Sequence, residues 1–124
     1  MRVATWNING LRARLDFIKI WLDSRQPDLV GFQELKLSDH EFPDDVFSEL
    51  GYHTAFNSQK AWNGVAIVSR QPIEDVSKDL SGHEDQGARL ITGLVDDLSF
   101  TTVYVPNGKD VDHGDFPEKL KWLD

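Results

Sequence analysis

The chain has 124 residues, enough for one ordinary domain and too few for two. Its 40% apolar and 27% charged residues are typical of a soluble globular protein, and no apolar run approaches the length that a bilayer requires. The absence of cysteine excludes disulfides, thiolate metal sites and cysteine nucleophiles, and the formal charge of −8 argues against nonspecific binding to nucleic acid.

The first part of the chain predicts a strand–helix–strand unit. Segments 5–10 and 29–34 read as short strands with polar endings, Asn7 in the first and Glu34 in the second. Between them, leucine and isoleucine at positions 11, 15, 18 and 22 form the stripe of an amphipathic helix, which must end before Pro27. Such a unit places both strand ends at the same edge of a sheet. We therefore expect Asn7 and Glu34 to be neighbours in space.

The rest of the chain indicates short helices and two strand pairs. Residues 43–50 are typical of a second helix closed by Gly51, followed by strands at 53–57 and 64–70. Another pair is predicted at 88–96 and 98–105 around a tight turn, and Asp115 is expected to cap a last helix that looks interrupted at Asp124. The predicted fold class is α/β, with a mixed sheet of about six strands and one to three helices.

Two of the predicted strands, 64–68 and 90–95, are apolar on both alternations, which is typical of strands covered on both faces. Two small helices cannot supply that cover. We therefore expect an uncovered, apolar sheet face through which the chain self-associates.

Five segments carry a resemblance to a known family. They are TWNINGLRA at 5–13, PDLVGFQELK at 27–36, GVAIVSR at 64–70, QGARLI at 86–91 and YVPNG at 104–108. In this order the segments resemble the N-terminal half of exonuclease III-type apurinic/apyrimidinic endonucleases, members of the endonuclease/exonuclease/phosphatase superfamily. The resemblance implies that residues 1–124 form half of a DNase I-like four-layer α/β sandwich.

The same resemblance implies a phosphodiesterase that depends on Mg²⁺ or Mn²⁺. It would act on double-stranded DNA, cutting at abasic sites and removing nucleotides from 3′ ends during base excision repair. Catalytic roles are implied for Asn7, Glu34 and Tyr104, with Asn7 and Glu34 at the metal and Tyr104 near the scissile phosphate. Asn107 is implied as a contact to the DNA backbone. Asn9 stands where some relatives carry aspartate, which weakens the case for a second metal.

Further DNA contacts are expected from basic and aromatic residues near strand ends or in loops, namely Arg12, Lys36, Lys60, Trp62 and Arg89. Structural alternatives remain open for several of the predicted site residues. Glu34 is also consistent with a solvated carboxylate, Asn7 with a helix cap or turn, Tyr104 with strand packing, and Trp62 with packing against the neighbouring loop.

The family completes its active site with groups from its second half, including residues that position water and transfer a proton. Nothing in this chain replaces them, so we expect negligible nuclease activity and weak Mg²⁺ binding from these 124 residues alone. Two alternatives stay open: a phosphodiesterase of the same superfamily acting on another phosphoester, and a non-enzymatic half-domain that self-associates or binds DNA.

The chain begins in strand-like sequence without a secretory signal. We expect a cytoplasmic protein without a membrane partner, associated with the nucleoid if the source is prokaryotic.

Overall fold

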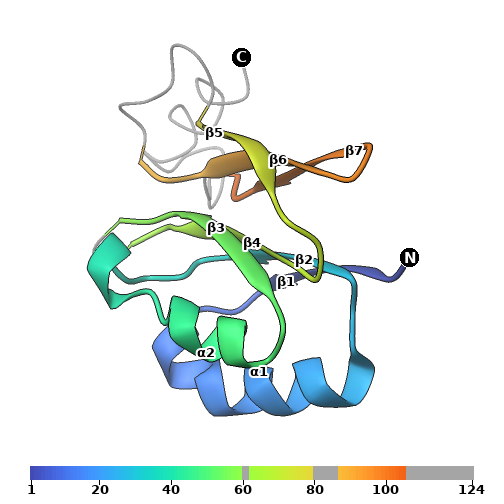
Figure 1. Cartoon of the computed structure of the whole chain (residues 1–124). Coiled ribbons are helices and arrows are strands. Elements are labelled where there is room, and N and C mark those ends of the chain that lie inside the picture. Colours follow the sequence, from blue (N-terminus) through green and yellow to red (C-terminus); the bar gives the residue numbers. More distant parts are fainter. Residues whose placement is uncertain (60–61, 80–86, 106–124) are drawn as a thin grey trace.

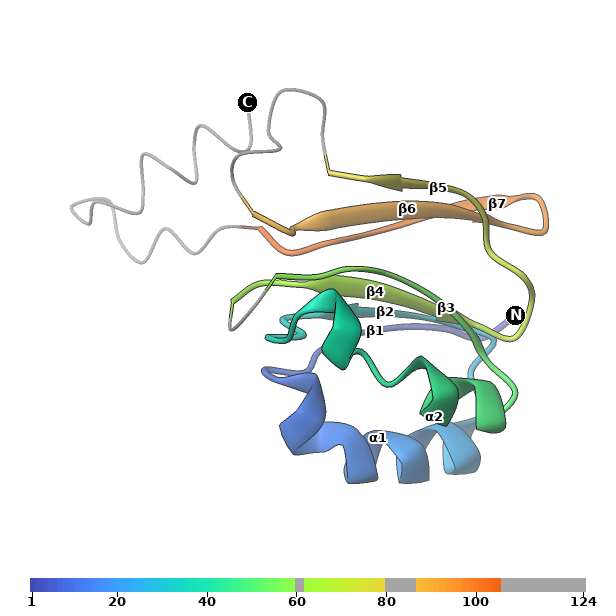
Figure 2. The same ribbon diagram turned by 60° about the vertical axis from the view of Figure 1, so that its left-hand side comes forward.

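The described part of the chain, residues 1–59, 62–79 and 87–105, forms two β-sheets and one layer of helices in the computed structural model (Figure 1). The elements in chain order are β1 (Val3–Asn7), α1 (Leu11–Arg25), β2 (Leu29–Gln33), the 3₁₀ helix η1 (Asp39–Glu41), α2 (Asp44–Glu49), β3 (His53–Asn57), β4 (Val65–Ser69), β5 (Glu74–Lys78), β6 (Leu90–Val95) and β7 (Leu98–Val103). The first sheet has the strand order β1-β2-β4-β3 and the second the order β5-β6-β7. Figure 2 shows the sheets face to face, with α1 and α2 on the far side of the first sheet.

The predicted strand–helix–strand unit is confirmed. β1 and β2 run parallel and in register from Val3 opposite Leu29 to Asn7 opposite Gln33. The helix between them, α1, buries an apolar face against the first sheet, and it ends where Gln26 adopts a left-handed conformation with φ of 47°. The unit therefore places the ends of β1 and β2 side by side.

β4 is the central strand of the described core. It pairs antiparallel with β2 on one side and with β3 on the other, and all five of its residues are buried. Ala66 and Val68 belong to the cluster under the helices, whereas Val65 and Ile67 belong to the cluster between the sheets. This double burial agrees with the continuously apolar sequence of the strand.

The α/β class and the half-sandwich layering are confirmed, but the single mixed sheet of about six strands is wrong. After β4 the chain crosses to a second layer, where β5, β6 and β7 form an antiparallel sheet of their own. β5 was not predicted, because its residues are mostly polar and all five are exposed. Ile91 and Val95 of β6 pack against Ile67 of β4, which ties the two sheets together through apolar contact.

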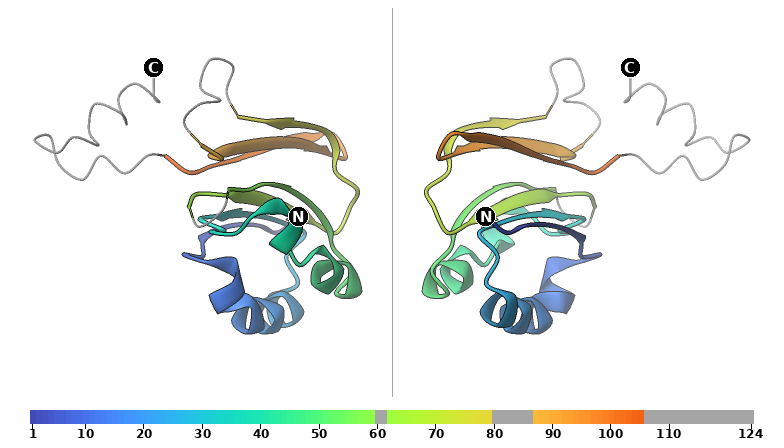
Figure 3. Two further views of the ribbon diagram at one scale, coloured as in Figure 1. Left: turned by 90° about the vertical axis from the view of Figure 1, so that its left-hand side faces the viewer. Right: turned by 90° about the vertical axis from the view of Figure 1, so that its right-hand side faces the viewer.

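The sheet face that was expected to be uncovered is therefore covered by the second sheet (Figure 3). The expectation that strand 90–95 is buried on both faces is wrong, because burial in β6 alternates along the strand. Its outward residues Leu90 and Leu94 are half-buried, and nearby Val76 and Val103 are 42% and 37% exposed. Any apolar contact surface of the second sheet lies on this outer face.

The predicted last helix, with Asp115 as its cap, lies outside the described residues. Within the described ranges, no helix has the length and apolar character needed to cross a membrane.

Candidate active site

The polar ends of β1 and β2 meet at one edge of the first sheet. Backbone hydrogen bonds extend the pairing beyond the strands, from the Ile8 amide to the Gln33 carbonyl (3.0 Å) and from the Gly10 amide to the Glu34 carbonyl (2.8 Å). Asn7 Nδ2 donates a hydrogen bond of 3.1 Å to Glu34 Oε1. The prediction that Asn7 and Glu34 are neighbours is confirmed.

The backbone at this edge is held in an uncommon conformation. Asn9, Glu34 and Lys36 all lie in the left-handed region, with φ of 46°, 58° and 56°. Each such residue other than glycine costs about 1–2 kcal/mol, so the surrounding structure must hold the turn in place. The next chain segment does so, because the Leu35 amide donates to the Gly64 carbonyl (3.1 Å) and the Lys36 amide to Asn63 (3.0 Å).

Glu34 is a carboxylate in a partly buried, donor-rich environment. Desolvation raises its pKa, but hydrogen bonds from Asn7 and Tyr104 and the charge of Lys36 together outweigh it, so the pKa of Glu34 is lowered. Lys36 Nζ lies 3.4 Å from Glu34 Oε2 and also donates to Asn9 Oδ1. The site therefore holds a negative charge at neutral pH that is already partly balanced by one ammonium group.

Tyr104 reaches the same carboxylate from the second sheet. It follows the end of β7, where its amide donates to the Arg89 carbonyl at 2.7 Å. Burial raises the pKa of Tyr104, and the adjacent Glu34 raises it further. The phenol therefore stays protonated at neutral pH and serves as a hydrogen-bond donor at the site.

Arg89 lies against Tyr104, with its guanidinium carbon 5.1 Å from the ring centroid. Its Nη1 also approaches the Tyr104 carbonyl at 3.4 Å. Desolvation lowers the pKa of Arg89, while Tyr104 acts in the opposite direction. Arg89 thus supports the position of the tyrosine from the side opposite to solvent, in a cation–π arrangement.

The other predicted DNA-contact residues lie in different environments. Arg12 is exposed and forms a 2.8 Å ion pair with Glu41, and Lys36 contacts Glu34 as described. Trp62 is 68% exposed, so it does not pack against the neighbouring loop. Lys60 and Asn107 lie outside the described residues.

Asn7 makes a local turn instead of capping α1. Its Oδ1 accepts a hydrogen bond from the Asn9 amide at 3.2 Å, and the N-cap position, Gly10, has no side-chain cap. The amide therefore presents its nitrogen to Glu34, and an amide nitrogen does not coordinate a hard cation. For Asn7 to become a ligand, its amide would have to rotate and release Asn9.

The donor set fits a hard cation only in part. Among the described residues there is no group of three or more His, Cys, Asp or Glu side chains that could hold a metal ion. Glu34 offers carboxylate oxygens at an edge open to solvent, which suits a cation that keeps several waters. Such a cation would be held through one carboxylate, one rotated amide and water.

Two further polar residues at this edge, Gln33 and Thr102, were missed by the sequence analysis. Both are buried, Gln33 at the end of β2 and Thr102 on β7. The available signal was a polar side chain inside an otherwise apolar strand, next to the predicted site residue Glu34.

Comparisons with known proteins agree with the resemblance of the motifs. Residues 4–122 match the endonuclease/exonuclease/phosphatase family. Exodeoxyribonuclease III of Haemophilus influenzae is 34% identical over 128 residues, covering 98% of this chain and 48% of that protein.

Solved structures of similar proteins share the fold. An AP endonuclease from Archaeoglobus fulgidus superimposes with a TM-score of 0.95 at 36% identity, covering 99% of this chain and 48% of that chain. A 3′ phosphatase from Neisseria, bound to a product DNA hairpin, gives a TM-score of 0.96 at 36% identity over the same shares. The chain thus spans about half the length of these relatives, and it belongs to the endonuclease/exonuclease/phosphatase family.

Proposed function

We propose that residues 1–124 are the N-terminal half of a divalent-metal-dependent phosphodiesterase domain that acts on DNA, as an AP endonuclease and 3′-5′ exonuclease of base excision repair. One observation carries the proposal: Asn7, Glu34 and Tyr104 come from three strand ends in two sheets and meet at one carboxylate. The names of the relatives, which include an exodeoxyribonuclease III and an AP endonuclease, support the reaction class.

In this proposal Glu34 is the cation ligand and Asn7 orients its carboxylate. Bound Mg²⁺ or Mn²⁺ would supply positive charge to balance the phosphate in the transition state. Tyr104, protonated and aimed at the same point, would donate a hydrogen bond to a phosphate oxygen. Lys36, which now balances the charge of Glu34, would be displaced toward the DNA backbone when a cation binds.

The proposed partner is double-stranded DNA with an abasic site or a 3′ end. Arg12 and Trp62 are exposed near the site-bearing loops, so both are accessible for contact with phosphates or bases. Arg89 would act partly through Tyr104, because it packs on that ring. Lys60 and Asn107 are proposed as contacts on the family resemblance.

The proposal predicts that the half-domain alone has negligible activity, because one carboxylate, one amide and one phenol do not position water or transfer a proton. A chimera tests the idea: the whole 124-residue chain is joined to the part of the Haemophilus exodeoxyribonuclease III that it does not span. We expect Mg²⁺-dependent cleavage of an abasic-site duplex by the chimera but not by the chain alone. Glu34→Gln should lower the rate about 100-fold or more.

The matched control is Glu49→Gln, which removes an exposed carboxylate from α2 and should leave the rate unchanged. A folded chimera that cleaves equally fast with Glu34→Gln would contradict the role of Glu34. Clear turnover by the pure 124-residue chain, abolished by Glu34→Ala, would contradict the incompleteness of the site.

Substrate class is tested with the same chimera. Cleavage of a phospholipid headgroup or an inositol phosphate in preference to the abasic duplex would favour the other phosphodiesterases of the superfamily.

A second candidate is a non-enzymatic half-domain that self-associates. It is favoured by the partly apolar outer face of the second sheet, where Val76 and Val103 are exposed beside the half-buried Leu90 and Leu94. Light scattering of the 124-residue chain distinguishes the two: a dimer that Val103→Ser converts to a monomer supports self-association through this face, and a monodisperse monomer excludes it.

A further inference from the structure

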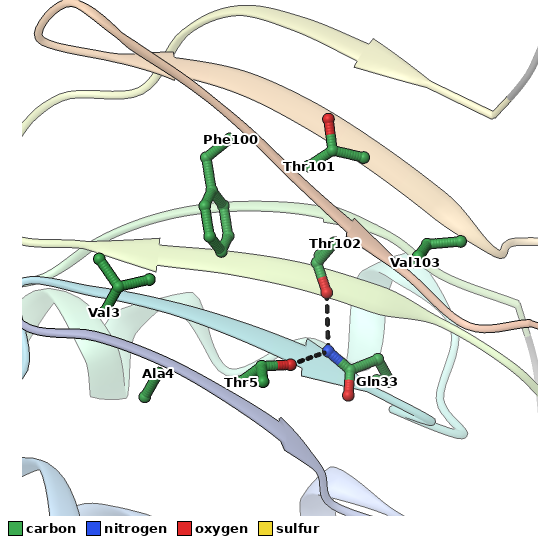
Figure 4. A pocket seen from close by; sticks show the side chains of 8 residues that line it. All are labelled: Val3, Ala4, Thr5, Gln33, Phe100, Thr101, Thr102 and Val103. Atoms are coloured by element: carbon green, nitrogen blue, oxygen red, sulfur yellow. Dashed lines mark hydrogen bonds between the residues drawn. The ribbon is translucent and has the colours of Figure 1, made fainter.

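A buried amide connects the two sheets next to the candidate active site. Gln33, the last residue of β2, donates from Nε2 to Thr102 Oγ1 on β7 at 2.7 Å and to Thr5 Oγ1 on β1 at 2.9 Å (Figure 4). The same nitrogen lies 3.1 Å from the Gly31 carbonyl. Gln33 is 9% exposed and Thr102 4%, so water does not compete for the contact. We call Gln33 and Thr102 the cross-sheet pair.

Gly31 allows the two strands to come close enough for this pair to form. A Cβ atom added at Gly31 would lie 2.8 Å from both Cβ and Oγ1 of Thr102, and 3.3 Å from the Phe100 ring. Any side chain at this position would push β7 away from β2. Three residues of the local sequence, Gly31, Gln33 and Thr102, therefore act together to bring the sheets into contact.

The cross-sheet pair lies directly behind the two side chains that meet at the site. Gln33 precedes Glu34, and Thr102 lies two residues before Tyr104, whose hydroxyl is hydrogen-bonded to Glu34. The remaining contact between the sheets is apolar, through residues such as Ile67 and Ile91. Apolar contact has no preferred direction, whereas a buried hydrogen bond fixes both distance and register.

We propose that Gln33 is a positioning residue of the site, whose hydrogen bond to Thr102 fixes the distance and register at which Glu34 and Tyr104 meet. The proposal rests on the proposed function in that it takes these two side chains as the functional pair. A purely structural role would instead affect the stability of the fold and leave the contact between Glu34 and Tyr104 as it is.

Thr102→Val removes this contact with little other change. Valine has nearly the shape of threonine, and Gln33 keeps Thr5 and the Gly31 carbonyl as acceptors, so no buried donor is left unpaired. Gln33→Asn is a second, independent variant that keeps the amide but shortens its reach by one methylene. The cavity of about 380 Å³ beside Gln33, between the edges of β1 and β7, leaves room for a rearranged side chain.

A matched control lies on the same strand. Thr101, adjacent to Thr102 on β7, faces the opposite side of the sheet, where its Oγ1 is 2.7 Å from Thr92 Oγ1. Thr101→Val makes the same chemical change on the exposed face of the second sheet. Thr102→Ser restores the hydroxyl and is the conservative rescue.

The experiment measures proton–proton contacts by NMR in the 124-residue chain, without metal. The chain has two tyrosines, so ring labelling gives signals from Tyr104 and from Tyr52, which serves as an internal reference for folding. We expect the contacts of Tyr104 ring protons with Glu34 side-chain protons to weaken several-fold in Thr102→Val and in Gln33→Asn. They should stay at the wild-type level in Thr101→Val and Thr102→Ser, with Tyr52 unchanged throughout.

Contacts that persist unchanged in both Thr102→Val and Gln33→Asn would overturn the positioning role. So would an equal loss in Thr101→Val. If Thr102→Val unfolds, which the Tyr52 signals reveal, Gln33→Asn decides the question. Failure of the proposed function has a different signature: Mn²⁺ added to the wild-type chain would not broaden the signals of Glu34 and Asn7, while the metal-free contacts still report on the cross-sheet pair.

Discussion

Glu34 combines a left-handed backbone with a carboxylate that accepts hydrogen bonds from two other strand ends. Glutamate gains nothing locally from a φ of 58°, since its side chain lacks the short-range hydrogen bonds that asparagine makes in this region. The conformation persists because the Leu35 and Lys36 amides are fixed by the loop before β4. Cost in the backbone together with charge in the side chain is the pattern found where a fold maintains a functional group.

Replacing Asn7 by alanine should raise the pKa of Glu34 toward its ordinary value. The Asn7 amide donates to the ionised form, so its removal makes ionisation less favourable. The measurement is an NMR titration of the Glu34 side-chain carboxyl carbon in wild type and variant. An unchanged pKa would show that the hydrogen bond contributes little, and Glu49 serves as an exposed reference carboxyl in the same spectra.

The same change predicts how stability depends on pH. The pKa of Glu34 is lower in the folded than in the unfolded chain, so its contribution to stability is present at neutral pH and is lost as the pH falls through the folded-state pKa. Asn7→Ala should therefore destabilise the chain more at neutral pH than in acid below that pKa. Urea unfolding at both pH values checks the difference, and an equal or larger effect in acid would contradict it.

The two arginines predicted as DNA contacts should differ in their effect on stability. Arg89 packs on the Tyr104 ring and is partly desolvated, so Arg89→Ala should lower the free energy of unfolding by roughly 1–2 kcal/mol. Arg12 forms an exposed ion pair with Glu41, so Arg12→Ala should change it by less than about 0.5 kcal/mol. Urea unfolding at low ionic strength measures both, and equal effects would contradict the structural distinction.

At the scale of elements, α1 was predicted from its apolar stripe, but its end depends on one residue. Gln26 closes the helix in a left-handed conformation, with its amide donating to the Leu22 carbonyl at 2.9 Å. Glycine adopts this conformation without steric cost, and Gln26 is exposed, so no packing is lost.

Gln26→Gly should therefore stabilise the chain by about 0.5–1 kcal/mol. The same substitution inside the helix, Lys19→Gly at an exposed position, should destabilise it by about 0.5–1 kcal/mol. Thermal unfolding of the two variants should thus shift in opposite directions. A loss of stability in both would contradict the conformation at the end of α1.

The elements that sequence patterns did not predict have weak local signals. β5 is exposed at every residue and contains a register shift near Asp75, which has φ of 51°. It forms a strand because β6 offers a free edge beside it, and not because its own sequence alternates. η1 lies within an acidic stretch that composition alone describes as surface.

At the scale of the whole molecule, the two sheets depend on one shared apolar cluster. Ile67 of the first sheet and Ile91 of the second are both fully buried in it. Ile67→Ala and Ile91→Ala should each lower the free energy of unfolding by about 2–5 kcal/mol, and both variants should still unfold in a single transition.

Val76→Ala, on the exposed strand β5, is the control and should change stability by less than about 0.5 kcal/mol. Urea unfolding followed by tryptophan fluorescence and by circular dichroism checks both the size of the effect and the agreement of the two probes. Two separate transitions, or a negligible effect of Ile91→Ala, would show that the second sheet does not share the core of the first.

The sequence by itself determined the features that short segments encode. The apolar period of α1, the continuous apolar runs of β2 and β4 and the polar strand ends at Asn7 and Glu34 are all local patterns, and the order of the motifs indicated the family. Their spatial meeting followed from the handedness and parallel pairing of a strand–helix–strand unit, which depend little on the rest of the fold.

Only the tertiary structure decided how the strands divide into two sheets and which side chains meet between them. Gln33 and Thr102 are 69 positions apart, and their contact depends on the close approach that Gly31 permits. Arg89 likewise appears in sequence as a phosphate contact and in the structure as a partner of Tyr104. Local periodicity reports which face of a segment is buried, but the partner across the interface is set by how whole layers pack, and no single segment encodes it.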